Sequence, residues 1–260
     1  MTGLAAYGHW IEPSWLQVRR TTVSIPGLPN ALQGMVIAHL SDFHLGRSFD
    51  PHGPVAQAIA ACDAARPDAV VLTGDFISGR RSISALATAL RQLSARPVFA
   101  VYGNHDYRFG PNHRRTLQRV LTDLGITVLD NRAVAFDHRG ERVWFIGVGD
   151  AYTSHDRLDV AQGGLTDGDR PRILLTHYPD LLFDVPANQF DLVLAGHTHG
   201  GQINLPFIVQ RALAHSDTAF SSGLFHVSGV PLYVNRGLET SNQRIRLFAR
   251  PELALITFHD

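Results

Sequence analysis

Residues 35–46 read MVIAHLSDFHLG, a short apolar run that leads directly into polar side chains. Four later stretches have the same form, each an apolar run followed by glycine or polar residues: AVVLTGD (69–75), PVFAVYGNHD (97–106), ILLTHY (173–178) and DLVLAGHTHG (191–200). Short apolar runs bounded by turn residues are typical of buried β-strands. The pattern therefore predicts a sheet whose strands end in loops with chemically reactive side chains.

The segments between the early strands have helical character, at residues 54–66, 82–95 and 112–124. Alternation of strand and helix is typical of an α/β fold with a parallel sheet. A second set of strands, AVAFDH (133–138), RVWFIGV (142–148), LFHVSG (224–229) and PLYVNR (231–236), has little helix between its members. We therefore expect two packed mixed β-sheets flanked by helices, in a single domain at 31–260 that follows an N-terminal strap at 1–30.

The charge balance and the apolar runs of the sequence indicate whether a nucleic acid or a membrane is an expected partner. Arg supplies all 23 basic residues, and Asp and Glu also number 23, so the formal net charge is zero. Nucleic-acid binding normally requires a basic stripe, and we expect no nucleic-acid partner. No apolar run is long enough to span a membrane. Trp10, Ile11, Trp15 and Leu16, followed by Arg19 and Arg20, suit either a lipid interface or packing across the domain.

Five clusters of metal-binding side chains follow the apolar runs. They are Asp42-Phe43-His44, Gly74-Asp75, Gly103-Asn104-His105-Asp106, His177 and Gly196-His197-Thr198-His199. Each cluster alone is compatible with an ordinary turn. All five follow predicted strands, whose loops converge at one sheet edge, and their joint occurrence predicts a metal site there. Two cations lying close together need a carboxylate to bridge them, and Asp75 on its glycine-led turn is suited to this.

The order of these clusters resembles the signature of the calcineurin-like metallophosphoesterase superfamily: D-x-H, G-D, G-N-H-[DE], H and G-H-x-H. The resemblance covers residues 42–199, and it implies a four-layer sandwich whose second half includes the C-terminal strands. It also implies that Asp42, His44 and His199 complete one metal site, while Asn104, His177 and His197 complete the other. The predicted cofactors are two divalent ions, of Mn, Fe or Zn, because the ligands mix oxygen and imidazole nitrogen.

The expected activity is cleavage of a phosphoester or pyrophosphate bond, with a metal-bridging hydroxide as nucleophile. Two dications carry +4, the Asp42 and Asp75 carboxylates −2 and a hydroxide −1, and the remaining charge of about +1 attracts an anion. The resemblance implies that His105 acts on the leaving group without binding metal, and Asp106 is expected to orient it. Arg236 is expected to contact either a phosphate or a salt-bridge partner, and Gln202 either to lie at the pocket rim or to begin the next strand.

Further stretches look like bacterial membrane-associated phosphoesterases of the UDP-2,3-diacylglucosamine pyrophosphatase type: EPSWLQVRRTTVSIPGLP (12–29), the long GHTHGGQ (196–202) and YVNRGLETS (233–241). This implies a lipid-linked diphosphate substrate. Two departures are the lack of an initial membrane helix and Glu239, which stands where a small residue is usual. The protein is accordingly expected either free in the cytoplasm or bound peripherally at the inner membrane face, and its oligomeric state is not predicted.

Three alternatives stay open. The same metal core would serve a broad nucleotide phosphodiesterase or phosphomonoesterase, because specificity resides in loops. A nuclease is disfavoured by the balanced charge, although Arg80, Arg81, Arg114 and Arg115 could gather. A non-catalytic scaffold is disfavoured by the intact clusters. Residues 151–170 and 214–222 are polar interruptions that suit either substrate lids or surface loops.

Overall fold

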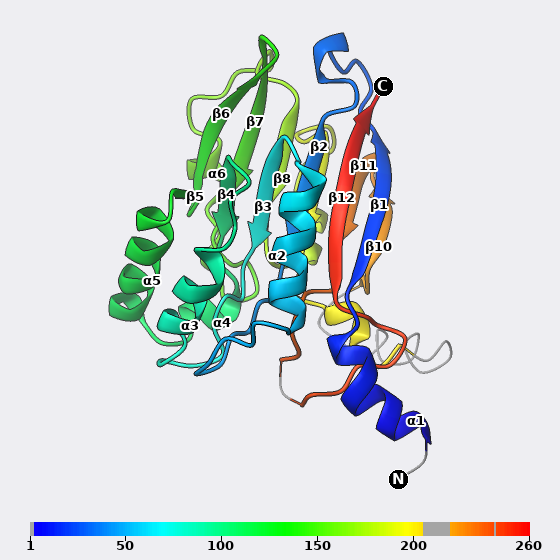
Figure 1. Ribbon diagram of the computed structural model, residues 1–260. Coiled ribbons are helices and arrows are strands. Elements are labelled where there is room, and N and C mark those ends of the chain that lie inside the picture. Colours follow the sequence, from blue (N-terminus) through cyan, green and yellow to red (C-terminus); the bar gives the residue numbers. More distant parts are fainter. Residues whose placement is uncertain (1–2, 205–218, 242) are drawn as a thin grey trace.

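The computed structural model describes residues 3–204, 219–241 and 243–260 (Figure 1). One six-stranded sheet has the order β1-β12-β2-β3-β4-β5. Neighbouring strands are parallel except for β12 and β2, which are antiparallel. The strand bounds are β1 Gln17–Ser24, β2 Val36–Leu40, β3 Ala69–Thr73, β4 Val98–Val101, β5 Ile126–Val128 and β12 Glu252–His259.

The second six-stranded sheet has the order β10-β11-β9-β8-β7-β6, with a parallel centre and an antiparallel hairpin at each edge. Its strand bounds are β6 Arg132–His138, β7 Glu141–Gly147, β8 Arg172–Leu175, β9 Leu192–Ala195, β10 Gly223–Val227 and β11 Val230–Val234. Both sheets are mixed, as the sequence predicts.

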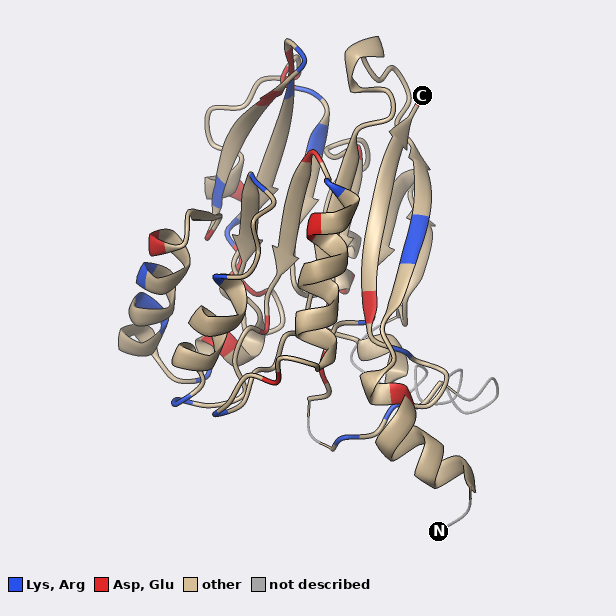
Figure 2. Ribbon diagram, viewed as in Figure 1, with Lys and Arg blue, Asp and Glu red and all other residues tan. Residues whose placement is uncertain are grey.

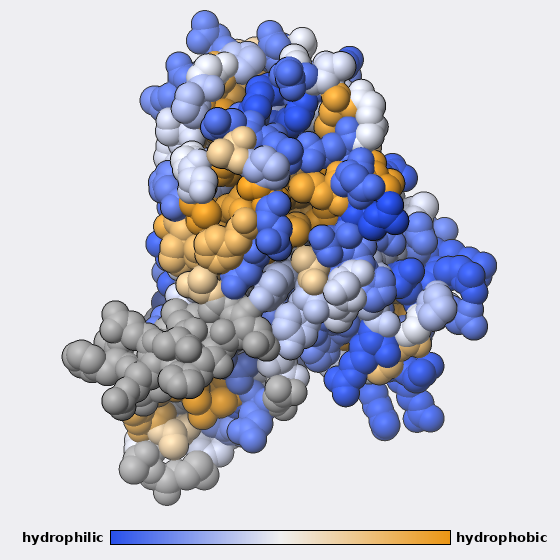
Figure 3. Space-filling view, turned by 180° about the vertical axis from the view of Figure 1, so that it is seen from behind, coloured by the Kyte–Doolittle hydropathy of each residue, from blue (hydrophilic) through white to orange (hydrophobic). Residues whose placement is uncertain are grey.

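Helices cover the outer faces of the two sheets unequally. Helices α2 Pro54–Ala65, α3 Ile83–Leu90 and α5 Pro111–Asp123 lie against the first sheet (Figure 1). The second sheet is covered by the short α6 Leu158–Ala161 and η4 Pro179–Phe183 together with loops, and apolar residues form a band across this rear face (Figure 3). The predicted four layers are therefore confirmed, with one thin outer layer.

The strand sequences explain this layering. In β3, Val71 packs between the two sheets, whereas Val70 and Leu72 pack against the helices. Successive side chains of a strand point to opposite faces, so an unbroken apolar run indicates burial on both. The layer between the sheets is mainly aliphatic and includes a few aromatic rings, with Phe99 stacked on Phe145 at 4.4 Å between ring centroids. This rigid double sheet supports the loops at its carboxyl edge.

Three strands, β1, β5 and β12, were not predicted from the sequence. β5 is too short to give a clear pattern, and the parallel pairing of β1 with β12 is not encoded by apolar periodicity. The C-terminal β12 also returns to the first sheet, whereas β10 and β11 lie in the second as expected. Helix α3 ends at Leu90 rather than Ala95, because the Asp63 carboxylate accepts hydrogen bonds from the backbone of Ser94 and Ala95.

The N-terminal segment consists of α1 Gly3–Ala6, η1 Tyr7–Ile11 and η2 Glu12–Ser14, and it protrudes from the molecule at the end where β2 and β3 finish (Figure 1). The Arg246 amide donates to the Gly8 carbonyl at 2.8 Å, and the Ala249 amide donates to the Glu12 carboxylate at 2.6 Å. None of the helices among the described residues is long and apolar enough to cross a membrane.

Candidate metal centre

The five predicted clusters lie at the carboxyl ends of five strands. Asp42 and His44 follow β2, Asp75 follows β3, and Asn104 begins the short α4 Asn104–Tyr107 after β4. From the second sheet, His177 follows β8, while His197 and His199 follow β9, with His199 beginning η5 His199–Gly201. Both sheets therefore contribute side chains to one buried group.

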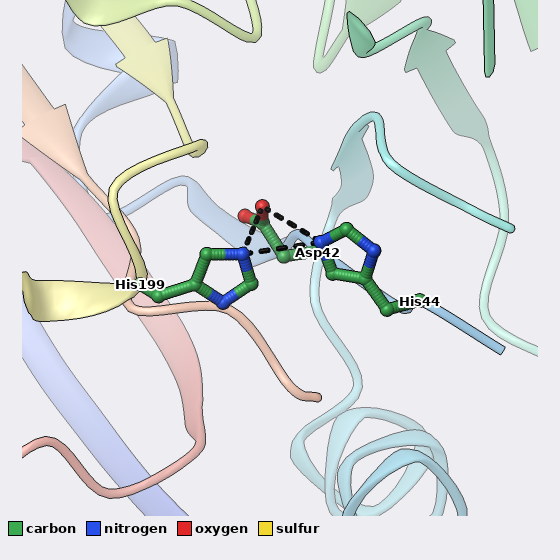
Figure 4. Close-up of side chains that lie close together, drawn as sticks. All are labelled: Asp42, His44 and His199. Carbon is green, nitrogen blue, oxygen red and sulfur yellow. Dashed lines mark hydrogen bonds and ion pairs between the residues drawn. The ribbon is translucent and has the colours of Figure 1, made fainter. Parts of the chain in front are cut away.

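The first part of the site joins Asp42, His44 and His199 (Figure 4). His44 Nε2 lies 3.1 Å from His199 Nε2 and 3.9 Å from Asp42 Oδ1, and His199 Nε2 lies 3.3 Å from that same oxygen. Asp42 Oδ1 is buried and has no hydrogen-bond partner among the described residues. Two imidazole nitrogens and an unsatisfied carboxylate oxygen, all facing one point, fit a divalent cation.

Asp75 lies between this group and the second one. Its Oδ2 is 3.3 Å from His44 Nε2 and also 3.3 Å from His177 Nε2. Its Oδ1 accepts a hydrogen bond from the His105 amide at 2.9 Å. A single carboxylate that faces imidazoles of both groups has the position that a bridging ligand requires.

The second part contains His177 and His197, and the assignment of Asn104 to it stays a prediction. His177 Nε2 lies 3.2 Å from His197 Nδ1, and its own Nδ1 donates to the Thr73 carbonyl at 2.6 Å. In the neutral ring this bond leaves Nε2 without a proton, as a metal ligand must be. The Asn104 Oδ1 is buried without a partner among the described residues. His199 is fixed in the same manner, since its Nδ1 lies 3.0 Å from the Glu239 carbonyl.

The local electrostatics suit a cation. Burial lowers the pKa of His44 to about 3 and the pKa values of His197 and His199 to about 4, so these rings are neutral at pH 7. Burial opposes the charge on Asp75 and His177, but their mutual attraction dominates, lowering the pKa of Asp75 and raising the pKa of His177. A metal ion and the His177 proton would therefore compete for the same position.

The backbone is strained at the candidate ligands. Asp42, His44, Asp75, His197 and His199 have φ values of 52°, 37°, 52°, 75° and 52°. Residues other than glycine rarely adopt this left-handed region, and when they do they cluster at functional sites. The surrounding structure holds the strain in place: the Asp42 amide donates to the Gly74 carbonyl at 3.0 Å, and the His44 amide to the Asp75 carbonyl at 2.8 Å.

Two glycines permit the close approach of these turns. A Cβ atom on Gly103 would lie 2.2 Å from Asp75 Oδ1, and one on Gly196 would lie 2.6 Å from Asp42 Oδ2. Real Cβ atoms do not come this close to other atoms. Glycine at these two positions therefore allows the candidate ligands Asp42 and Asp75 to lie against the neighbouring turns.

His105 and Asp106 lie in α4 but face different partners. The His105 ring is half-buried and edge-on to the His44 ring at 4.7 Å, and its Nδ1 lacks a partner among the described residues. The buried Asp106 carboxylate instead accepts the amides of Phe76 at 3.0 Å and Gly103 at 2.9 Å. Asp106 thus links two ligand-bearing turns, and its influence on the His105 ring stays a prediction.

The two predicted substrate contacts lie at the margin of the site. Arg236 Nε is 3.5 Å from the buried Glu252 carboxylate, which corresponds to the salt-bridge alternative, and its contact with a phosphate stays a prediction. The Gln202 side-chain amide donates to the Gln243 carbonyl at 3.1 Å. The loop 214–222 lies partly outside the described residues, while residues 151–170 form turns and α6, and a lid role stays a prediction for both.

The sequence patterns missed a buried cation behind the site. Arg246 is fully buried and donates to the carbonyls of Arg236, Gly237, Glu239 and Ala249 at 2.7–3.2 Å. The segment that Arg246 holds also contacts a candidate ligand, since the Glu239 amide donates to the Asp42 carbonyl at 3.0 Å. The only sequence signal was an Arg between Ile245 and Leu247, and such a residue is usually exposed.

The buried imidazole and carboxylate groups at this edge of the sheets form a candidate site for divalent metal ions. Residues 35–201 match the family described as Calcineurin-like phosphoesterase, and this range includes every candidate ligand. The chain therefore belongs to the calcineurin-like phosphoesterase family and is a phosphoester hydrolase of a family that uses divalent metals.

Curated relatives agree with this assignment over nearly the whole chain. The sequence is 30% identical to "Phosphodiesterase YaeI" of Escherichia coli, covering 96% of this chain and 91% of the relative. It is 33% identical to "Uncharacterized metallophosphoesterase YkoQ" of Bacillus subtilis, covering 93% and 90%. It is 27% identical to "UDP-2,3-diacylglucosamine pyrophosphatase LpxG" of Chlamydia muridarum, covering 96% and 91%.

Proposed function

We propose that the protein binds two divalent ions and hydrolyses a phosphodiester or pyrophosphate bond. The observation that carries the proposal is Asp75 Oδ2, which lies 3.3 Å from the imidazoles of both His44 and His177. Asp42, His44 and His199 would hold one ion, and Asn104, His177 and His197 the other. Bound at such a site, the two ions supply a hydroxide nucleophile at neutral pH and polarise the phosphoryl oxygens.

The residues around the ions have separate tasks. His105 stands beside His44, half-buried, with an unpartnered Nδ1. From there its ring can stabilise charge on the phosphoryl group or give a proton to the leaving oxygen. Asp106 fixes the turns that carry Asp75 and Asn104 through the Phe76 and Gly103 amides. We assign it a positioning role.

For the substrate, we propose a lipid-linked diphosphate of the UDP-sugar type as the first candidate. The name of the Chlamydia relative, aligned over 96% of this chain, supports it. The second candidate is a nucleotide phosphodiester or monoester, and the name of the Escherichia coli relative, at slightly higher identity, supports a phosphodiester. Both candidate substrates contain a phosphate group bonded to an organic group.

We also propose that the N-terminal segment contacts a membrane surface. Leu4, Trp10, Ile11 and Trp15 are each half-exposed, and the Arg250 guanidinium lies 3.9 Å from the Trp15 ring centroid. The single acid of this segment, Glu12, is buried. Exposed aromatic rings beside Arg suit the interface of an anionic membrane. Sedimentation with vesicles of anionic and of neutral lipid tests this. More protein should be found in the pellet with anionic vesicles than without vesicles, and an equal amount in the two pellets would contradict the proposal.

Hydrolysis of bis(p-nitrophenyl) phosphate tests the catalytic proposal. The protein is stripped of metal, titrated with Mn²⁺, and assayed for metal content and turnover on the same samples. The proposal predicts that activity rises as two equivalents bind. Binding of fewer than two ions at saturation would refute the two-ion site, and the absence of metal binding and turnover together would favour a scaffold.

A further inference from the structure

Beside the His197 side of the site lies a group of aromatic rings that the hydrolysis itself does not use. We propose that Tyr152 and Tyr178 form a stacking platform on which a planar ring of the substrate, a nucleobase, is held while its phosphate lies at the metal centre. This inference rests on the proposed function and names the side chains that would hold the nucleobase of either proposed substrate. It assigns Tyr152 as a specificity-determining residue.

The rings lie directly against a candidate ligand. The Tyr152 ring centroid is 5.1 Å from that of His197, and the Tyr178 centroid is 5.3 Å from it in an edge-on arrangement. The two tyrosines are 5.5 Å apart. Tyr178 is the residue after His177, and Tyr152 is 45% exposed. A substrate whose phosphate lies at the metal site of His177 and His197 would therefore have an accessible aromatic surface beside that phosphate.

The turn that carries Tyr152 is fixed by hydrogen bonds. The buried Asp150 carboxylate accepts the Thr153 amide at 2.9 Å and the Thr153 hydroxyl at 2.6 Å. The His155 amide donates to the Asp150 carbonyl at 2.9 Å, which closes the turn. Tyr152 lies inside this turn, so its backbone is held before any ligand arrives, and less conformational freedom is lost on binding.

A second set of contacts fixes the turn to the catalytic side of the molecule. The His155 ring stacks on the Tyr107 ring at 4.0 Å between centroids. The Tyr107 hydroxyl donates to Asp130 at 2.8 Å, and the Arg114 guanidinium lies 4.4 Å from the Tyr107 centroid. Tyr107 ends α4, the helix that begins with Asn104 and His105. The platform and the catalytic residues are therefore connected through one short helix.

The chemistry of the platform favours a flat ring over an acyl chain. Every nucleobase has a π face, and stacking on an aromatic side chain is tolerant of base identity. An acyl chain gains most from enclosure in an apolar groove, whereas Tyr152 is half-exposed in a turn with the polar side chains of Thr153 and His155. A nucleoside phosphate or a nucleoside diphosphate conjugate matches both the metal site and the platform.

The experiment compares two ligands that carry the same phosphate. Binding of UMP and of ribose 5-phosphate is measured by calorimetry on the Mn²⁺-loaded protein, for the wild type, Tyr152→Ala and Tyr152→Phe. The wild type should bind UMP about tenfold more tightly than ribose 5-phosphate, given typical stacking strength. Tyr152→Ala should remove this preference without weakening ribose 5-phosphate binding, and Tyr152→Phe, which retains the ring, should keep it.

The outcomes separate this inference from the catalytic proposal. Equal affinity of the wild type for the two ligands, undetectable UMP binding, or a Tyr152→Ala variant that keeps the preference would each overturn the platform. Equal weakening of both ligands in Tyr152→Ala would also overturn it, because this result indicates a structural role. Failure of the proposed function shows instead in metal content and in hydrolysis of bis(p-nitrophenyl) phosphate, which are measured on the same samples.

Discussion

The strands of this protein and the turns that follow them differ in almost every physical respect. β3 and β9 consist entirely of buried residues in regular pairing. The turns after them carry Asp75 and His197, which are polar, largely enclosed and in left-handed backbone conformations. The stable sheets therefore hold the site in a shape that the turns alone would not adopt.

This division has an energetic basis. A fully buried aliphatic side chain stabilises the fold by about 1.5–3 kcal/mol, whereas a non-glycine residue in a rare backbone conformation costs about 1–3 kcal/mol. Changes in a strand should therefore lower stability and spare the chemistry, and changes of a candidate ligand in a turn should impair the chemistry at a smaller cost in stability.

The largest effect is expected for Asp75→Ala, in the turn after β3. Loss of the carboxylate between His44 and His177 should empty at least one metal site and lower turnover by about a thousandfold or more, since a metal ion contributes several kcal/mol to the barrier. Metal analysis and steady-state kinetics check this, with the exposed Asp123→Ala on α5 as control. Retention of both ions would overturn the bridging role.

The matching change in a strand is Leu194→Ala in β9, where the side chain is fully buried. Truncation leaves a cavity between packed layers and should lower the free energy of unfolding by about 2–5 kcal/mol. Chemical denaturation measures this loss. Metal content and turnover of the folded protein should stay near wild type. A large loss of metal affinity at retained stability would break the contrast between strand and turn.

A smaller effect on chemistry is expected from His105→Ala. The metal content should stay normal, while turnover falls by about a hundredfold, in line with the loss of a general acid or of a group that stabilises charge. Metal analysis and kinetics on a substrate with a poor leaving group give the clearest reading. Since His105 also lies within reach of the His44 and Asp75 ligand atoms, loss of an ion in this variant would reassign it as a ligand.

The smallest effect concerns pH in the metal-free protein. The pKa of His177 is raised by Asp75, so its stabilising contribution is complete below its ordinary pKa of about 6.5 and is lost as the pH rises through the folded-state value. The pKa of Asp75 is lowered, so its contribution is lost only as the pH falls in the acid range. The stability difference between wild type and His177→Gln should therefore shrink above neutral pH. A constant difference from pH 6 to 9 would contradict the pairing.

Much of the architecture could be predicted because local sequence determines it. The runs at 35–40 and 191–196 form strands as expected, since an apolar run between turn residues has few other solutions. The pairing of β12 with β1 and β2 could not be predicted in this way, because it joins residues at opposite ends of the chain. Burial of Arg246 was likewise hidden, since its partners are backbone carbonyls, which every residue has.

For the site, the predicted ligands could be placed together because their spacing after strands is local and their chemistry is specific. What the spacing could not supply is the orientation of neighbouring side chains. His105 and Asp106 are adjacent, yet one faces His44 and the other the Phe76 and Gly103 amides. The approach of Tyr152 to His197 is hidden for the same reason, because it depends on a turn fixed by Asp150.

Electron paramagnetic resonance of the Mn²⁺-loaded protein, with the metal content of the same sample measured in parallel, tests whether Asp75 bridges two ions. Two ions per chain, joined through the Asp75 carboxylate, should give an exchange-coupled signal that Asp75→Ala abolishes. A signal of isolated Mn²⁺ ions at full loading of the wild type would contradict a bridged pair of ions.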